Sequence, residues 1–243
     1  MVESEETPDI AASPTPPHPG VPAPHVTYPG DTLEAALLRH AVEIPAEQRL
    51  LLDRYCRLLW DWNEKINLTR HTDYERFVSR DLVDTLQLSA LLLPKEEVLE
   101  IGSGGGVPGV VLAILRPDLA ITLTESVGKK AKVLNDIVKK LGLKVRVIDA
   151  RAETVLKQER FDATIARAVG PLAKLLTWLQ PHWLSAGRLL AIKGPKWSDE
   201  RGEARHRGLL NELELRKAAE YPLAGTESQS VILKVWPSGA QER

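Results

Sequence analysis

A glycine-dense turn near the middle of the chain points most directly to chemistry. Residues 102–109 read GSGGGVPG and follow an apolar run that ends at Ile101. Glycine lets a backbone turn sharply and lie against a bound ligand because it has no side chain. Gly104, Gly106 and Gly109 also fit the dinucleotide pattern G-x-G-x-x-G, which is weak evidence alone. The turn predicts a nucleotide-type cofactor where a strand meets a helix.

Two carboxylates accompany this turn. Glu100 lies inside the expected strand before it, and Glu125 ends the next expected strand. An acid at the position of Glu125 can accept hydrogen bonds from ribose hydroxyls. Both acids are common in S-adenosylmethionine sites, although nicotinamide enzymes share the ribose-binding one. The alternative for Glu125 is that it is simply an exposed acid at the end of a strand. For Glu100, a structural role and a functional role are equally well supported.

Short β-rich runs alternate with helical stretches after Pro94, which predicts a parallel sheet with helical crossovers. Two later runs, 213–221 and 230–236, have no long helix between them and predict an antiparallel edge. The expected parallel strands are 98–101, 121–125, 145–148, 163–166 and 189–193, and the helices between them cover about 107–116, 128–141, 152–157 and 171–184.

The first ninety residues have a different character. The first thirty contain eight of the 17 prolines and predict a disordered tail. Apolar stripes at helical spacing then predict one helix after Asp31-Thr32, one after Pro45 and one over about residues 74–92. We therefore expect a tail over residues 1–30, a helical cap over 31–93 and a sheet domain over 94–243.

Composition excludes several classes of protein. The single cysteine, Cys56, cannot form an intrachain disulfide, and no charged segment followed by an apolar run opens the chain, so we expect a cytoplasmic protein. The longest apolar runs, such as 88–93, are far shorter than the roughly 20 residues of a membrane helix. The six histidines are scattered, and no cluster has metal-ligand spacing, so we expect no metal.

The net charge of -1 conceals an asymmetry. The first thirty residues carry four carboxylates and no Lys or Arg, which leaves +3 on the remainder. Such a balance permits local basic patches but no large phosphate footprint. The densest patch is a candidate RNA contact, although such runs are more often solvated helix faces. Its members are Lys129, Lys130, Lys132, Lys139, Lys140, Lys144, Arg146 and Arg151.

Several motifs together resemble the bacterial 16S rRNA guanine-N7 methyltransferase G family, also called glucose-inhibited division protein B. They are WNEKINLT at 62–69, the 102–109 turn followed by Arg116-Pro117, ESVGKK at 125–130, ARA at 166–168 and LAIKG at 190–194. The resemblance runs from about Leu33 to Val235. It implies a Rossmann-like S-adenosylmethionine-dependent methyltransferase fold, mostly parallel with an antiparallel C-terminal edge, behind an N-terminal helical cap.

The resemblance also implies a function and a set of site residues. The expected reaction is methylation of guanine N7 in a loop of small-subunit rRNA, by a monomer that meets the rRNA or the small ribosomal subunit. Arg167 lies at the C-terminal end of an expected parallel strand, and parallel sheets bind their ligands beyond these strand ends. The implied cofactor-binding residues are Gly102, Gly104, Gly106, Val107, Glu125, Ala152, Glu153 and Arg167; the catalytic ones are Arg167, Arg151 and Lys193; the substrate-binding ones are Asn67, Arg80 and Asp84.

The chain departs from the family pattern at two places. Where the family usually has Arg-His followed by Leu-Asp-Ser, residues 80–85 read RDLVDT, so Asp81 replaces a histidine and Thr85 a serine. A basic Arg-His pair near the C-terminus is replaced by Ser228-Gln229. Both changes remove positive or titratable groups that could meet phosphate.

The absence of a catalytic triad agrees with the chemistry of guanine N7. That atom carries a lone pair and no proton, so methyl transfer needs alignment more than a general base. A pyrimidine-C5 enzyme needs a thiolate, but Cys56 lies on an apolar helix, and residues 166–171 (ARAVGP) lack the motif of exocyclic-amine enzymes. Two alternatives remain: a methyltransferase for another RNA base or a small molecule, and a non-catalytic ribosome-binding module.

Overall fold

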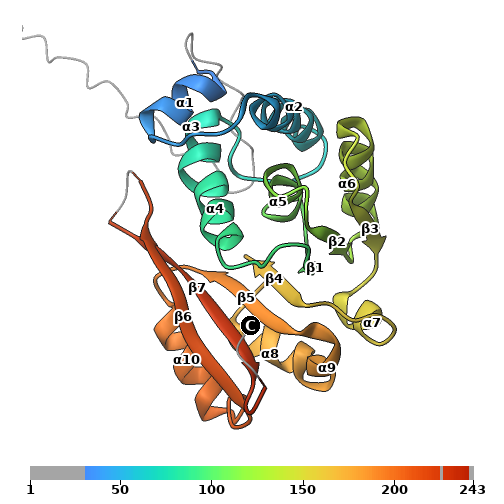
Figure 1. The fold of residues 1–243 in the computed structure, drawn as a ribbon, viewed down its shortest axis with the longest axis vertical. Helices are drawn as coiled ribbons and strands as arrows, with labels where there is room; N and C mark the ends of the chain where they lie inside the picture. Colours follow the sequence, from blue (N-terminus) through green and yellow to red (C-terminus); the bar gives the residue numbers. More distant parts are fainter. Residues whose placement is uncertain (1–30, 225–226, 241–243) are drawn as a thin grey trace, which may run out of the picture.

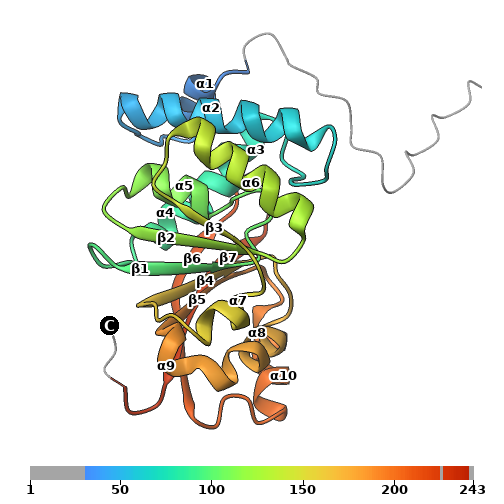
Figure 2. The same ribbon diagram turned by 90° about the vertical axis from the view of Figure 1, so that its right-hand side faces the viewer.

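A seven-stranded mixed sheet forms the centre of the computed structural model, which describes residues 31–224 and 227–240 (Figure 1). The predicted disordered tail, residues 1–30, lies outside the described residues. Helices cover both faces of the sheet, as expected for the Rossmann-like class (Figure 2). The strands are β1 (Glu97–Ile101), β2 (Ala120–Glu125), β3 (Arg146–Asp149), β4 (Ala163–Arg167), β5 (Arg188–Lys193), β6 (Leu213–Pro222) and β7 (Gln229–Pro237).

In the strand order β3-β2-β1-β4-β5-β7-β6, successive strands are added in one direction from β1 to β3 and in the other direction from β4, so the order reverses between β1 and β4. The first five strands are parallel, and β7 pairs antiparallel with both β5 and β6. This confirms the mostly parallel sheet and the antiparallel C-terminal edge predicted from the sequence. Ligands of open parallel sheets bind beyond the carboxyl ends of the strands at such a reversal, so the expected site lies beyond Ile101 and Arg167.

Both faces of the sheet are apolar because the strands are covered on both sides. Val98 and Ile121 belong to one buried cluster, whereas their neighbours on the strands, such as Leu99, belong to the other. Figure 2 shows one group of helices above the sheet and the other group below it. The first group includes α5 (Gly109–Leu115) and α6 (Gly128–Leu141), and the second contains α7 (Ala152–Leu156), α8 (Leu172–Leu179), α9 (Trp183–Ala186) and α10 (Trp197–His206).

The predicted helix over 171–184 is in fact broken. α8 ends at Leu179, a 3-10 turn η2 (Gln180–His182) follows, and α9 begins at Trp183. Pro181 lies within η2, and proline cannot donate the backbone hydrogen bond that a continuous α-helix needs. The sequence therefore contained the signal for this break.

The first two helices, over residues 33–39 and 46–63, form an outer layer on one side of the sheet, whereas the helix over 83–89 packs against the sheet itself (Figure 2). Thr32 caps the first helix by accepting a hydrogen bond from the Ala35 amide at 3.1 Å, as the sequence suggested. The predicted helix over 74–92 is helical from Tyr74 to Ser89, but its middle part is π-helical. The elements are α1 (Leu33–Arg39), α2 (Ala46–Asn63), α3 (Tyr74–Arg76), the π-helix η1 (Phe77–Leu82) and α4 (Val83–Ser89).

A buried ion pair fastens the segment before β1 to the start of β5. Both Nη atoms of Arg188 donate to the Glu96 carboxylate at 2.8 Å, and Nη2 also donates to the Leu91 carbonyl at 3.1 Å. Only 4% of the Arg188 side chain is exposed. A charge in this position depends on its partner because water cannot solvate it.

Glu96→Ala is therefore expected to lower the free energy of unfolding by about 3–5 kcal/mol, the usual effect of leaving a buried charge unpaired. Urea denaturation measures the change. The matched control is Glu203→Ala, which removes an exposed pair with Arg207 at 3.5 Å and should cost less than about 0.5 kcal/mol. Equal effects of the two substitutions would contradict the structural role of the buried pair.

Candidate functional site

The glycine turn joins β1 to α5 at the carboxyl edge of the sheet. The Ser103 amide donates to the Thr124 carbonyl at 2.9 Å, which ties the turn to the end of β2. Gly106 has a φ of +99°, and a Cβ there would lie 2.6 Å from Val110 Cγ2. This position therefore requires glycine for both conformation and space. A Cβ on Gly104, in contrast, would meet nothing within 4 Å, so this side of the turn is open to a ligand.

Glu100 supports the turn from below. It is 1% exposed, and its Oε1 accepts a hydrogen bond from the Gly109 amide at 3.2 Å. A Cβ on Gly109 would lie 2.3 Å from Glu100 Oε2, so the two residues are in direct contact. Burial raises the pKa of Glu100 to about 7. This geometry favours the structural role over the functional one.

Glu125 lies across the turn at the end of β2. Its Oε2 accepts a hydrogen bond from the Gly104 amide at 3.0 Å, and its Oε1 accepts one from the Val127 amide at 2.7 Å. The side chain is buried, so the alternative of an exposed strand-end acid is wrong. The carboxylate is thus held beside the open side of the turn.

The neighbouring strand end contributes a further acid that sequence reasoning missed. Asp149, which pairs in register with Glu125, ends β3, and a Cβ on Gly128 would lie 2.9 Å from its Oδ2. Ala152 and Glu153 follow at the start of α7, the first buried and the second half-buried. An acid at the end of an expected strand was the signal that could have identified Asp149.

Arg167 forms the centre of an ionic cluster at the end of β4. Its Nη2 pairs with Asp81 of η1, and its Nε pairs with Asp84 of α4 at 3.1 Å. Asp81 also accepts from His71 Nδ1 at 2.8 Å, and Asp84 accepts from the Tyr221 hydroxyl at 2.7 Å. Arg167 is therefore not a surface cation. Sequence reasoning missed the roles of Asp81, His71 and Tyr221, since they lie far from Arg167 along the chain.

Burial and charge act in opposite directions on the two carboxylates. Burial alone would raise the pKa of Asp81, but Arg167 and His71 hold it below its ordinary value. Burial prevails at Asp84 and raises its pKa. Arg167 Nη1 is buried and has no hydrogen-bond partner among the described residues. Two of the three guanidinium nitrogens are thus paired, and the third is buried and unpaired.

A cavity of about 360 Å³ lies against this cluster and brings together Arg80, Asp84, Arg167 and Lys193. Lys193 is only 8% exposed, and its Nζ donates to the Gly170 carbonyl at 2.6 Å and pairs with Glu200 at 2.7 Å. It is therefore not a strand-end surface residue. Four of the residues expected from the sequence to contact substrate or catalyse the reaction thus share one cavity.

Two other expected residues do not line this cavity. Arg151 is exposed where the chain enters α7, and Asn67 is exposed in the loop after α2. The buried amide of that loop belongs to Asn63, whose Oδ1 accepts from the Leu68 and Thr69 amides at 2.7 and 2.9 Å. Asn63 thus caps the loop.

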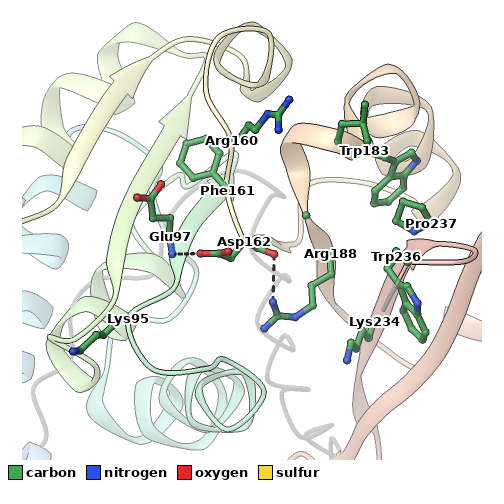
Figure 3. A pocket seen from close by; sticks show the side chains of 13 residues that line it. Lys95, Glu97, Arg160, Phe161, Asp162, Trp183, Arg188, Lys234, Trp236 and Pro237 are labelled. Atoms are coloured by element: carbon green, nitrogen blue, oxygen red, sulfur yellow. Dashed lines mark hydrogen bonds between the residues drawn. The ribbon is translucent and has the colours of Figure 1, made fainter. Parts of the chain in front are cut away.

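A larger cavity, of about 790 Å³, lies at the opposite ends of the strands. Figure 3 shows Glu97 on one side of it, Trp236 on the other, and Asp162 and Arg188 between them. These residues lie at the amino ends of β1, β4 and β5 and at the carboxyl end of the antiparallel β7. It is not the expected ligand site, because parallel sheets bind ligands at the carboxyl ends of their strands.

Metal and membrane signals are absent from the described part of the chain. Within residues 31–224 and 227–240, no three His, Cys, Asp or Glu side chains are grouped to hold a metal ion. No helix in the same ranges has the length and apolar character needed to span a membrane.

The strand order, the glycine turn after β1 and the acid at the end of β2 define a Rossmann-like methyltransferase. A solved O-methyltransferase from Bacillus cereus, in complex with SAH, has the same fold, with a TM-score of 0.57 at 16% identity over 84% of this chain and 100% of that one. The family model for rRNA small subunit methyltransferase G matches residues 48–224. The chain belongs to this family.

Individual relatives agree with the family model. Ribosomal RNA small subunit methyltransferase G from Rhodopirellula baltica is 54% identical over 190 residues, which cover 78% of this chain and 82% of the relative. The protein of the same name from Thermobifida fusca is 41% identical over 167 residues, 68% of this chain and 70% of the relative. The resemblance found in the sequence motifs is thereby confirmed.

The raised pKa of Glu100 predicts a pH-dependent loss of stability. The pKa of Glu100 is about 7 in the folded protein and ordinarily 4.5, so between pH 4.5 and pH 7 folding is accompanied by uptake of a proton. The free energy of unfolding therefore falls by about 3 kcal/mol as the pH rises through this range. Glu100→Gln keeps an acceptor for the Gly109 amide but carries no charge. Urea unfolding should show this variant to be more stable than the wild type at pH 8 but not at pH 4. Equal differences at both values would contradict the prediction.

Proposed function

We propose that this chain transfers the methyl group of S-adenosylmethionine to guanine N7 in a loop of small-subunit rRNA. The observation that carries the proposal is the cavity at the carboxyl edge of the sheet, where Arg80, Asp84, Arg167 and Lys193 meet. Membership of the rRNA small subunit methyltransferase G family supports the substrate class.

The residues of the glycine turn fit this cofactor. Gly104 leaves open space where other residues have a side chain. Gly102, Gly104, Gly106 and Val107 would hold the methionine end, and Glu125 would accept from the ribose. Ala152 and Glu153 would flank the adenine. When bound, S-adenosylmethionine supplies a methyl group activated by a positively charged sulfur.

The cavity of about 360 Å³ beside Arg167 suits a purine. Arg167 Nη1 is the one nitrogen of that guanidinium with no partner among the described residues, and guanine O6 is an acceptor where adenine has a donor. Arg80 and Lys193 would hold the neighbouring phosphates, and Asp84 would orient Arg167. Since guanine N7 carries no proton, the protein has only to align the base with the methyl group.

For the rest of the RNA we propose contacts along α6 and the start of α7. Lys129, Lys132 and Arg151 are exposed there, and none of them takes part in an ion pair that the structure describes. Lys140 and Arg146, in contrast, pair with Asp136 and Glu159. We therefore assign Arg151 to phosphate contact rather than to catalysis. We propose that Asn67, exposed in the loop after α2, contacts the RNA as well.

We further propose that the protein acts as a monomer in the cytoplasm, where its ribosomal substrate is assembled. A small molecule or another RNA base is the competing substrate, and the observation in its favour is the replacement of basic residues at Asp81 and Ser228-Gln229. Bulk RNA at low salt should inhibit an RNA enzyme and leave a small-molecule enzyme unaffected.

Methyl transfer from labelled S-adenosylmethionine tests the proposed function. Small ribosomal subunits that lack the modification should accept label, and nuclease digestion should release it as N7-methylguanosine, whereas large subunits serve as the control. If no RNA accepts the methyl group, or if the label is found on an atom other than N7, the proposal is wrong.

Glu125→Gln tests the proposed cofactor contact separately. Loss of a charged acceptor for the ribose should weaken binding of S-adenosylhomocysteine about tenfold, as expected for a hydrogen bond to a charged group. Calorimetry measures this affinity. Glu159→Gln, which removes an exposed partner of Arg146, is the matched control and should leave it unchanged. A similar affinity for both variants would count against the assignment of Glu125.

A further inference from the structure

Asp81 makes none of the contacts with cofactor or RNA that the proposed function assigns. It is 2% exposed, lies in the π-helix η1 and does not line the cavity. Its Oδ1 pairs with Arg167 Nη2 and also with His71 Nδ1. The hydroxyl of Thr85, the second departure in the same motif, donates to the Asp81 carbonyl at 2.7 Å. The two departures within this motif are therefore in direct contact with each other.

The ion pairs of the cavity give Asp81 a place in its charge balance. Among the described residues that line the cavity, Arg80, Arg167 and Lys193 are positive, and Asp84 and Glu200 are negative. Lys193 pairs with Glu200, and Arg167 with Asp84. Adding Asp81 gives three carboxylates for three cations. Without it, the site would carry one excess positive charge when His71 is neutral.

The proposed reaction moves a positive charge into this cavity. The lone pair of guanine N7 forms the new bond to the methyl carbon while the bond from that carbon to sulfur breaks. The electron pair of the broken bond stays on sulfur, which becomes neutral, and the purine becomes positively charged. Charge that develops in a water-poor site responds strongly to fixed charges nearby. An excess cation beside the base would therefore oppose the transfer.

We propose that Asp81 is a positioning residue that neutralises Arg167, so that this guanidinium can contact the target base without opposing the positive charge that the base acquires. The inference rests on the proposed function and adds a residue that the family pattern does not supply. A neutral histidine at position 81 has no negative charge to offer. Asp81 and Asp84 together also occupy Nη2 and Nε, which leaves Nη1 as the nitrogen for the base.

The test compares Asp81→Asn with Asp81→Glu in single-turnover methyl transfer to small-subunit rRNA. Asp81→Asn keeps the shape and removes the charge, and we expect a rate about tenfold lower, because the carboxylate that offsets Arg167 is lost. Asp81→Glu keeps the charge and should retain the rate within about threefold. The KM values for RNA and cofactor should not rise in either variant.

A structural role would give a different pattern. If Asp81 served only to hold the cap in place, both variants would lose activity and the KM for RNA would rise, which overturns the inference. An unchanged rate in Asp81→Asn overturns it as well. Asp81→His is the second variant in case Asn or Glu does not fold, since the family pattern has histidine here, and it should show the same loss of rate at pH 8.

The outcomes separate this inference from the proposed function. A wild-type protein that methylates no rRNA overturns both. A wild-type protein that methylates guanine N7, together with an Asp81→Asn variant of equal rate, overturns only the role of Asp81. A double variant moves the negative charge to a neighbouring position. Asp81→Asn combined with His71→Asp restores a carboxylate nearby, and its rate should be at least threefold higher than that of Asp81→Asn alone.

Discussion

The Arg167 guanidinium is the point at which three distant parts of the chain are joined. Asp81 and Asp84 reach it from the N-terminal helices, and Tyr221 of β6 reaches Asp84 from the C-terminal hairpin. A buried cation is tolerated only with partners in good geometry. The cluster therefore fixes the cap, the centre of the sheet and its antiparallel edge relative to one another. The cavity between them takes its shape from this constraint.

The cap is also in direct contact with the glycine turn. The Tyr55 hydroxyl of α2 donates to the Gly105 carbonyl at 2.9 Å, and a Cβ on Gly105 would lie 2.9 Å from Leu59 Cδ1. The N-terminal helices thus form one wall of the site as well as an outer layer of the fold. A change in the packing of α2 would reach the cofactor turn and, through η1, the Arg167 cluster.

The sequence predicted what depends on local patterning. Apolar runs and turn residues located all seven strands to within about one residue, and α6 has the predicted limits, Gly128–Leu141. The π-helix was beyond such reasoning, because an apolar stripe at ordinary helical spacing does not distinguish it from a continuous helix. The Arg167–Asp81 pair joins residues 86 positions apart, so no local pattern could reveal it. Motif resemblance brought Arg80, Asp84, Arg167 and Lys193 together, but spacing alone could not show which carboxylates neutralise the cations.

Under the proposed function, the unpartnered nitrogen of Arg167 would connect the stability of the site to its specificity. A buried donor without a partner costs about 1–3 kcal/mol, and among the described residues nothing accepts from Nη1. The free protein bears this cost, and a ligand that brings an acceptor removes it. A base with a hydrogen-bond donor in place of guanine O6 would leave Arg167 Nη1 without an acceptor, and its own donor would be unpaired as well. Sites built in this way reject the wrong ligand more strongly than apolar pockets do. Discrimination between purines can therefore arise in a cavity that contains no general base, from the same guanidinium that holds the fold together.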